Sequence, residues 1–186
     1  GQPDDARLDF SQSVMPRVSL EGEVLHALDG SHEVPLTTTF CAPGHGDTLD
    51  SVRLSGVAAR LRELGVEHVL VSNVDNLGAS PDPRHVGAHL RAVDEGAQLS
   101  VEVVQREGDA GGCIAGVEGR AVIVEGFRLP EGTDLDRYPE FNTNTLWFTI
   151  DALERELPLT WFCVQRSVEW AGGVSRPVIQ FERLIG

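Results

Sequence analysis

The segment VSNVDNLGA, residues 71–79, combines side chains that could bind a substrate or a metal ion. A β-branched run leads directly into Asn73, Asp75 and Asn76, and ligands of open α/β sheets bind beyond the carboxyl ends of strands. Asn73 and Asp75 are two residues apart, so an extended backbone would point both to the same side. A carboxylate there suits Mg²⁺, which takes few protein carboxylates together with substrate oxygens. A purely structural turn explains the segment equally well.

A second segment, APGHGD at residues 42–47, places His45 between two glycines and in front of a predicted helix. Gly44 and Gly46 would let the backbone approach a ligand closely, and a helix N-terminus favours an anionic group. A Pro-Gly turn that is followed by Asp47 as a helix cap explains the same residues without any ligand. The motif alone therefore leaves both interpretations open.

A third segment, FNTNTLW at residues 141–147, has Asn142 and Asn144 on either side of Thr143. On an extended backbone both amides would face one side. An amide group both donates and accepts hydrogen bonds, which suits the hydroxyls of a sugar. An Asn-rich turn that enters a strand is the structural alternative. The Gly-rich stretch GDAGGC, residues 108–113, is compatible with a simple hairpin turn.

The elements that must position these segments follow from the hydrophobic pattern. Asp82 and Pro83 signal the start of a helix, and Gly96 signals its end. Alternating helices and strands in the first half indicate an α/β fold with a mixed, mainly parallel central sheet, to which the second half adds mixed or antiparallel strands. The predicted helices span residues 47–64, 83–95 and 151–156, and the predicted strands span 66–72, 99–104, 120–127, 145–150, 160–168 and 177–184.

The composition limits the classes of protein to which the chain can belong. Its 186 residues suffice for one domain with a substantial core. The formal net charge of -14 argues against a nucleic-acid partner. The sequence contains no apolar run near 18 residues, so it predicts no membrane partner. Lysine is absent, so a mechanism that needs a lysine must obtain it from elsewhere. The cysteines Cys41, Cys113 and Cys163 lack metal-ligand spacing and indicate a reduced, cytoplasmic protein.

Taken together and in order, the motifs resemble those of eukaryotic-type UTP–glucose-1-phosphate uridylyltransferases, also called UDP-glucose pyrophosphorylases. That family carries QSxxPR, PPGHGD, VSNxDNLGA, a DxKGG turn, a strand with a glutamate, FNTNxLW and viQlE. This sequence has QSVMPR at residues 12–17, APGHGD, VSNVDNLGA, GDAGG, VIVEG around Glu125, FNTNTLW, and VIQFE at residues 178–182. The match extends over nearly the whole chain with similar spacing.

The resemblance implies a Rossmann-like, GT-A-like nucleotidyltransferase domain that forms UDP-glucose and pyrophosphate from UTP and glucose 1-phosphate, with Mg²⁺ as cofactor. It implies that Asp75 holds the metal and that Asp75 and Arg166 serve catalysis. The residues that it implies for substrate binding are Gln12 at the uracil edge, Gly44 at the base, His45 and Asn73 at the sugar-phosphate pocket, and Gly111, Gly112, Glu125, Asn142 and Asn144 at the glucose hydroxyls.

The sequence also departs from the family pattern. The Gly-rich loop LxGGxGTxxG with its following lysine, and the C-terminal β-helical region, have no counterpart in residues 1–186. The lysine of the KGG turn is Ala110, and a later family lysine corresponds to Arg166, whose planar guanidinium has a different geometry. We therefore expect a partial, apparently truncated nucleotidyltransferase catalytic domain with little turnover by itself. A non-catalytic sugar-nucleotide-binding module and a pyrophosphorylase for another sugar 1-phosphate are the alternatives.

Overall fold

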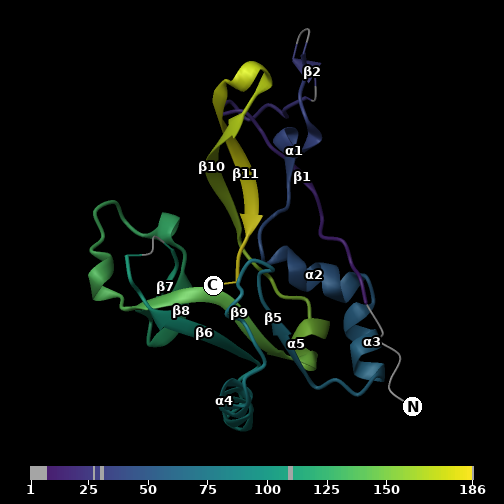
Figure 1. The fold of residues 1–186 in the computed structure, drawn as a ribbon, viewed down its shortest axis with the longest axis vertical. Coiled ribbons are helices and arrows are strands. Elements are labelled where there is room, and N and C mark those ends of the chain that lie inside the picture. The colour runs from purple at the N-terminus through teal and green to yellow at the C-terminus, as the bar shows by residue number, and fades with distance from the viewer. Residues whose placement is uncertain (1–7, 27, 30–31, 109–110, 186) are drawn as a thin grey trace. The chain divides into compact units, whose positions relative to one another are not determined.

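A computed structural model describes residues 8–26, 28–29, 32–108 and 111–185 of the chain (Figure 1). The chain divides into two compact units. The first is built from the residues up to Ala58 together with Glu156–Ile185, and the second is Ala59–Arg155. Among the helices within the described ranges, none has both the length and the apolar character that a bilayer crossing requires.

The first unit contains a long antiparallel ribbon of two strands, which is yellow-green to yellow in Figure 1. Val18 attaches the N-terminal segment to this ribbon, because its N–H and C=O each exchange a 2.9 Å hydrogen bond with Ile179. Val164 and Val178 are buried on the ribbon. The elements of this unit are β1 (Met15–Pro16), β2 (Leu28–Asp29), β3 (His32–Glu33), α1 (Leu36–Thr39), β4 (Phe40–Cys41), α2 (Asp47–Leu54), β10 (Trp161–Glu169) and β11 (Ser175–Arg183).

The predicted helix over residues 47–64 is wrong as a single element. The structure has α2 followed by α3 (Val57–Glu63), and Gly56 between them adopts a φ of 81°. A left-handed residue cannot continue a right-handed helix, and glycine adopts that conformation without a steric penalty. Leu54, at the end of α2, is consequently 73% exposed instead of packed on a continuous apolar face.

The second unit is a five-stranded sheet with one long helix. That helix, α4, begins where the sequence predicts, because the Asp82 carboxylate accepts the Arg84 N–H at 2.8 Å and Pro83 occupies the first turn. Phe148 and Leu153 are almost completely buried in the core of this unit. Its elements are β5 (His68–Val71), α4 (Pro83–Asp94), β6 (Leu99–Gln105), β7 (Cys113–Val117), β8 (Arg120–Val124), β9 (Glu140–Thr149) and α5 (Ile150–Glu154), with 3₁₀ turns at Gly126–Arg128 and Leu135–Arg137.

Strand β9 is the centre of the sheet, and every strand pairing in the described part of the sheet is antiparallel. Strand β6 pairs with β9 along one edge, whereas β5 and then β7 share the other edge, and β8 pairs with β7. The predicted mixture of helices and strands is confirmed, but the mainly parallel arrangement is wrong. Strands β5 and β6 do run in the same direction, but β9 lies between them. Hydrophobic periodicity identifies strands and says nothing about which strand becomes the neighbour.

The pairing of β6 with β9 is interrupted by a bulge on β9. Glu102 pairs with Thr145, and the next residue, Val103, pairs with Asn142, so Thr143 and Asn144 have no partner on β6. The Thr143 hydroxyl donates to the Glu102 carbonyl at 2.9 Å, and Asn144 adopts a φ of 54°. Strand β9 therefore begins before the predicted residue 145, and the FNTN motif lies on its bulged first half.

Candidate functional site

In the second unit, the bulge on β9 brings together the two asparagines of the FNTN motif. Asn142 Nδ2 donates to Asn144 Oδ1 at 2.8 Å, and the Asn144 N–H donates to Asn142 Oδ1 at 3.1 Å. The expectation that both amides face one side is confirmed, although a bulge brings them together and not simple alternation along an extended strand. Together with Gly111, Gly112 and Glu125 they form what we call the amide cluster.

The Gly-rich turn lies against this pair of asparagines. A Cβ on Gly112 would lie 3.5 Å from Glu125 Oε2 and 3.6 Å from the Asn142 Cβ, and the Asn142 N–H donates to the Gly112 carbonyl at 3.2 Å. At Gly111 a Cβ would overlap the Phe141 ring, with only 2.3 Å to Cε2. Asp109 and Ala110, which complete the predicted turn, lie outside the described residues.

The guanidinium of Arg106 fixes this turn. Arg106 Nη2 donates to the carbonyls of Gly112 at 3.1 Å and Gly111 at 3.4 Å. Its guanidinium also lies 5.4 Å from the centre of the Phe141 ring. Because its partners here are main-chain carbonyls and a ring, no motif in the sequence points to Arg106.

The VSNVDNLGA motif leaves β5 as a tight turn, not as an extended segment. The Asn76 N–H donates to the Asn73 carbonyl and the Leu77 N–H donates to the Asp75 carbonyl, each at 3.1 Å. The expectation that Asn73 and Asp75 share a side through strand alternation is therefore wrong. Asn76 anchors the turn to β9, since its Nδ2 donates to Thr145 Oγ1 at 2.9 Å.

Asp75 is exposed on this turn, and among the described residues none forms a hydrogen bond or ion pair with its carboxylate. No group of three or more His, Cys, Asp or Glu side chains that could hold a metal ion occurs within the described ranges. A site for Mg²⁺ needs no such group, because the ion is commonly bound by one or two carboxylates and by substrate phosphates. Asp75 fits that donor set as the single protein carboxylate.

In the first unit, the QSVMPR and APGHGD motifs meet. Gln12 Nε2 donates to the Gly44 carbonyl at 3.1 Å, although the two residues are far apart in the sequence. Gly44 has a φ of 82°, and a Cβ there would lie only 2.5 Å from the Arg183 carbonyl oxygen. The neighbouring His45 Nδ1 accepts the Ile185 N–H at 3.3 Å. Three of the predicted site residues, Gln12, Gly44 and His45, therefore lie at one place.

Arg166, the predicted catalytic cation, lies on β10 with a half-exposed side chain. Its Nη2 is 3.3 Å from Glu182 Oε1 on the paired strand β11. Glu182 also accepts a hydrogen bond from Gln180, whose own Oε1 accepts from Arg17 Nε at 3.1 Å. The VIQFE strand thus carries a row of polar side chains that links Arg166 to the QSVMPR motif.

Asp47 is 1% exposed and does not cap α2, whose N-cap residue is Gly46. Its Oδ2 accepts the Ser13 N–H at 2.9 Å and the Ser51 hydroxyl at 3.1 Å, and its Oδ1 accepts from Arg183 Nη2 at 2.6 Å. Burial by itself would raise the pKa of Asp47, but the hydrogen bonds from Ser13, Arg183 and Ser51 outweigh it and hold the pKa below its usual value. The predicted capping role is wrong because the carboxylate is used to join three segments.

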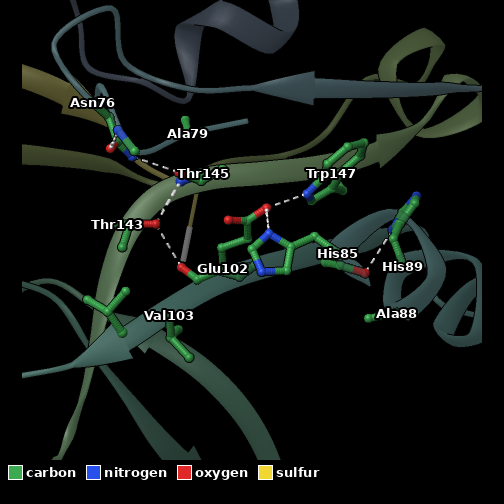
Figure 2. Close-up of a pocket in the computed structure, with 14 residues that line it drawn as sticks. Asn76, Ala79, His85, Ala88, His89, Glu102, Val103, Thr143, Thr145 and Trp147 are labelled. Carbon is green, nitrogen blue, oxygen red and sulfur yellow. Dashed lines mark hydrogen bonds and ion pairs between the residues drawn. The ribbon is translucent and has the colours of Figure 1, made fainter. Parts of the chain in front are cut away.

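A cavity of about 480 Å³ opens in the second unit between α4, β6 and β9 (Figure 2). Glu102 is its central acceptor, since Oε1 receives the Trp147 Nε1–H at 2.7 Å and lies 3.2 Å from His85 Nδ1. Among the described residues that line the cavity, none belongs to the predicted site. The spacing of His85 and His89 by four positions on α4 was the signal that could have identified this face.

His89 is expected to make the stability of the second unit depend on pH. It is 1% exposed and lies between His68 Nδ1 at 3.1 Å and Ser100 Oγ at 2.8 Å. Burial lowers the pKa of His89, and the charge of His68 lowers it further. Because the folded-state pKa lies below the unfolded value of about 6.5, stability is present above that pH and is lost as the pH falls towards the folded pKa.

The measurement is urea unfolding from pH 8 to pH 5. His89→Gln should flatten the fall in unfolding free energy below pH ~6.5 and should cost about 1–3 kcal/mol at pH 8, because Ser100 and His68 lose a buried partner. His26→Gln, at an exposed histidine, serves as the control and should retain the wild-type profile. An unchanged pH profile in the His89 variant would exclude this histidine as the source.

A family model described as UTP–glucose-1-phosphate uridylyltransferase matches residues 4–186. The UTP–glucose-1-phosphate uridylyltransferase of Encephalitozoon cuniculi is 30% identical over 182 residues, which cover 95% of this chain and 36% of that protein. The Saccharomyces cerevisiae protein of the same description is 31% identical over 153 residues, covering 78% and 30%. The chain therefore spans about a third of the length of these curated relatives.

The fold of the chain is similar to that of solved UDP-glucose pyrophosphorylase structures. The UDP-glucose pyrophosphorylase of Leishmania major, known in open and closed structures, superimposes with a TM-score of 0.74 at 26% identity over 98% of this chain and 42% of that chain. A Trypanosoma brucei structure, described as a UDP-glucose phosphorylase, superimposes with a TM-score of 0.78 at 23% identity, over 94% and 41%. These likenesses confirm the predicted α/β nucleotidyltransferase fold.

Proposed function

Since the chain belongs to the UTP–glucose-1-phosphate uridylyltransferase family, we propose that it contributes substrate-binding groups to an enzyme that forms UDP-glucose and pyrophosphate from UTP and glucose 1-phosphate. The amide cluster is the observation that carries the proposal. Asn142 and Asn144 hold each other in one orientation beside Glu125, and Gly112 leaves the adjoining space without a side chain.

The amide cluster suits a sugar because its donors and acceptors are fixed before any ligand arrives. After the bond between the two amides, Asn144 keeps both N–H groups of its Nδ2 for hydroxyl oxygens. The Glu125 carboxylate offers acceptors for hydroxyl hydrogens. A hydroxyl needs both kinds of partner. Because the amides are already ordered, binding costs less side-chain entropy than it would with free rotamers.

Gln12 and Gly44 suit the edge of a pyrimidine base for a similar reason. Gln12 donates one amide hydrogen to the Gly44 carbonyl, so its Oε1 and its second N–H can bind a ligand. Uracil presents a carbonyl acceptor beside an N–H donor, which matches an amide edge. The absence of a Cβ at Gly44 lets this loop pack against the Arg183 carbonyl of β11, which holds the Gly44 carbonyl beside Gln12.

The proposed reaction needs no covalent enzyme intermediate. A phosphate oxygen of glucose 1-phosphate bonds to the α-phosphorus of UTP, while the bond from that phosphorus to the bridging oxygen breaks and pyrophosphate leaves with the electron pair. Asp75 would hold Mg²⁺, which neutralises phosphate charge when it is bound. Arg166 adds a permanent positive charge, which its contact with Glu182 partly compensates. The chain's own groups bind and orient the two substrates.

The proposal is tested by incubating the purified natural gene product with UTP, glucose 1-phosphate and Mg²⁺. We expect equal amounts of pyrophosphate and UDP-glucose. Product from N-acetylglucosamine 1-phosphate but not from glucose 1-phosphate would overturn the sugar assignment. Binding of UDP-glucose without turnover of any sugar 1-phosphate would overturn catalysis and identify a non-catalytic sugar-nucleotide-binding module.

Asn144→Gly is expected to weaken sugar binding selectively. Glycine removes the amide but tolerates the φ of 54° at this position, so the bulge should persist. The loss of a hydrogen bond to a sugar hydroxyl should raise the KM for glucose 1-phosphate by about threefold to tenfold, with little change in the KM for UTP. Thr143→Ser, which keeps the hydroxyl bonded to Glu102, is the neighbouring control. Equal increases in both KM values would contradict a sugar-specific role.

A further inference from the structure

Arg183, at the end of β11, binds both sides of the loop that contains Gly44. Its main-chain carbonyl accepts the Gly46 N–H at 2.9 Å, and its own N–H donates to the Pro43 carbonyl at 2.8 Å. Its guanidinium forms a fork between two carboxylates of α2, with Nη2 2.6 Å from Asp47 Oδ1 and Nη1 2.6 Å from Asp50 Oδ2. One residue therefore fixes the loop through its backbone and the helix behind the loop through its side chain.

The buried carboxylate of Asp47 extends this network to the other wall of the proposed base site. Its second oxygen accepts the Ser13 N–H at 2.9 Å. Ser13 follows Gln12, whose amide donates to the Gly44 carbonyl at 3.1 Å. The contacts form a closed circuit that runs from Arg183 through Asp47 and Ser13 to Gln12, and back through the Gly44 loop.

The charge of the Arg183 side chain makes these contacts depend on this residue. Asp47 is 1% exposed, so its ionised form depends on charged and hydrogen-bonding partners. The guanidinium itself is mostly buried, and it stacks 4.8 Å from the centre of the Trp161 ring, which limits its freedom. A lysine would preserve the charge but could not reproduce the planar fork to two carboxylates.

We propose that Arg183 is a positioning residue that sets the spacing between Gln12 and the Gly44 loop, and thereby the affinity and selectivity of the enzyme for the uracil nucleotide. This inference rests on the proposed function. When the fork is broken, the Asp47 carboxylate must find compensation elsewhere, and the Ser13 N–H that it accepts moves with it. The Gln12 amide would then no longer present its free edge at the distance and angle that uracil requires.

The test is Arg183→Lys in the natural gene product, compared with Arg62→Lys. Arg62 is a matched control because it also joins two carboxylates, those of Asp151 and Glu154, and none of these three residues is a proposed substrate group. For Arg183→Lys we expect a KM for UTP that is about tenfold higher, from one lost charge-assisted hydrogen bond, and a reduced preference for UTP over CTP. The KM for glucose 1-phosphate and kcat should stay within about twofold. Arg62→Lys should leave all four values unchanged.

A purely structural role would lower the melting temperature without this difference between the two substrates. Equal rises in both KM values, or an unchanged preference for UTP over CTP, would overturn the inference. If Arg183→Lys does not fold, Asp50→Asn replaces it, because it breaks one arm of the fork at a partly exposed carboxylate. Its KM for UTP should rise by about threefold, and a wild-type value would overturn the inference.

Calorimetry with uridine 5′-monophosphate separates this inference from the proposed function, because it needs no turnover. If the wild type binds this nucleotide but forms no UDP-glucose, the proposed function fails, and a weaker affinity in Arg183→Lys would still support the positioning role. If the wild type is active and the variant binds the nucleotide equally well, the inference alone fails. If the wild type neither binds nor turns over a uracil nucleotide, both are overturned.

Discussion

Replacement of Asp75 by asparagine is expected to lower kcat by on the order of 10²-fold or more, because it weakens the proposed ligand of Mg²⁺ at the reacting phosphates. An amide oxygen carries no formal charge and is a poorer ligand for Mg²⁺ than a carboxylate. The Mg²⁺ concentration that gives half-maximal turnover should rise in parallel. Steady-state turnover as a function of Mg²⁺ concentration measures both effects.

The same replacement is expected to leave the fold intact. The hydrogen bonds that define the turn use the main-chain groups of Asn73, Asp75, Asn76 and Leu77, and the Asn76 side chain attaches it to β9. None of these bonds involves the Asp75 carboxylate, so the melting temperature should not change. Asp94→Asn, at an exposed residue of α4, is the control for removing one negative charge from the second unit. Wild-type turnover in the Asp75 variant would remove this residue from the mechanism.

Replacement of Asp47 by alanine is expected to reduce the free energy of unfolding of the first unit by about 3–5 kcal/mol. The variant leaves the Arg183 guanidinium without one of its two carboxylates and leaves the Ser13 N–H without its acceptor. Breaking a buried pair is costly because the remaining charge stays desolvated. Urea unfolding at pH 7 measures the loss, and Asp94→Ala should stay within about 0.5 kcal/mol of the wild type. A similarly small change for Asp47→Ala would contradict the role of the buried network.

Unfolding at low pH should provide an independent measure of the contribution of Asp47 to stability. The pKa of Asp47 is lower in the folded state than the unfolded value of about 3.9, because its hydrogen bonds outweigh its burial. Its contribution to stability is therefore complete above pH ~4 and is lost as the pH falls through the folded-state pKa. The alanine variant should lack this part of the acid transition, and an identical acid transition in both proteins would count against it.

Local signals predicted those parts of the fold that depend on neighbouring residues. Helix α4 has a capping aspartate, a proline in its first turn and a glycine after its end, and the structure places it where these signals indicate. Strands β10 and β11 follow from their β-branched and aromatic residues. Strand β7 was missed because Cys113–Val117 consists mainly of small residues without an alternating pattern. The relative direction of the strands was predicted wrongly because it depends on β9. Its pairing partners in β5 and β6 lie 35 to 81 positions earlier, and a local hydrophobic pattern carries no information about partners so far away.

The residues of the candidate site also fall into two groups. Some were identified from their own sequence motifs, and others depend on contacts between distant segments. Gln12, Gly44, Asn142 and Asn144 were selected as site residues from their motifs, but the hydrogen bonds that join them in pairs were not predicted. Arg183 was not selected, because it acts on main-chain groups and carboxylates that only the fold brings near. The contact between His68 and His89 joins a strand to a helix, and the sequence of neither segment alone predicts it.

The bulge on β9 also bears on how such a protein can change over time. It adds two residues, Thr143 and Asn144, and side chains on a strand alternate with a period of two. Loss or gain of both residues would preserve the alternation on either side, whereas an insertion of one residue would exchange the two faces of the sheet. A lineage can therefore delete Thr143 and Asn144 together and keep an intact strand. The proposed sugar contact of Asn144 and the strand that carries it can thus change separately.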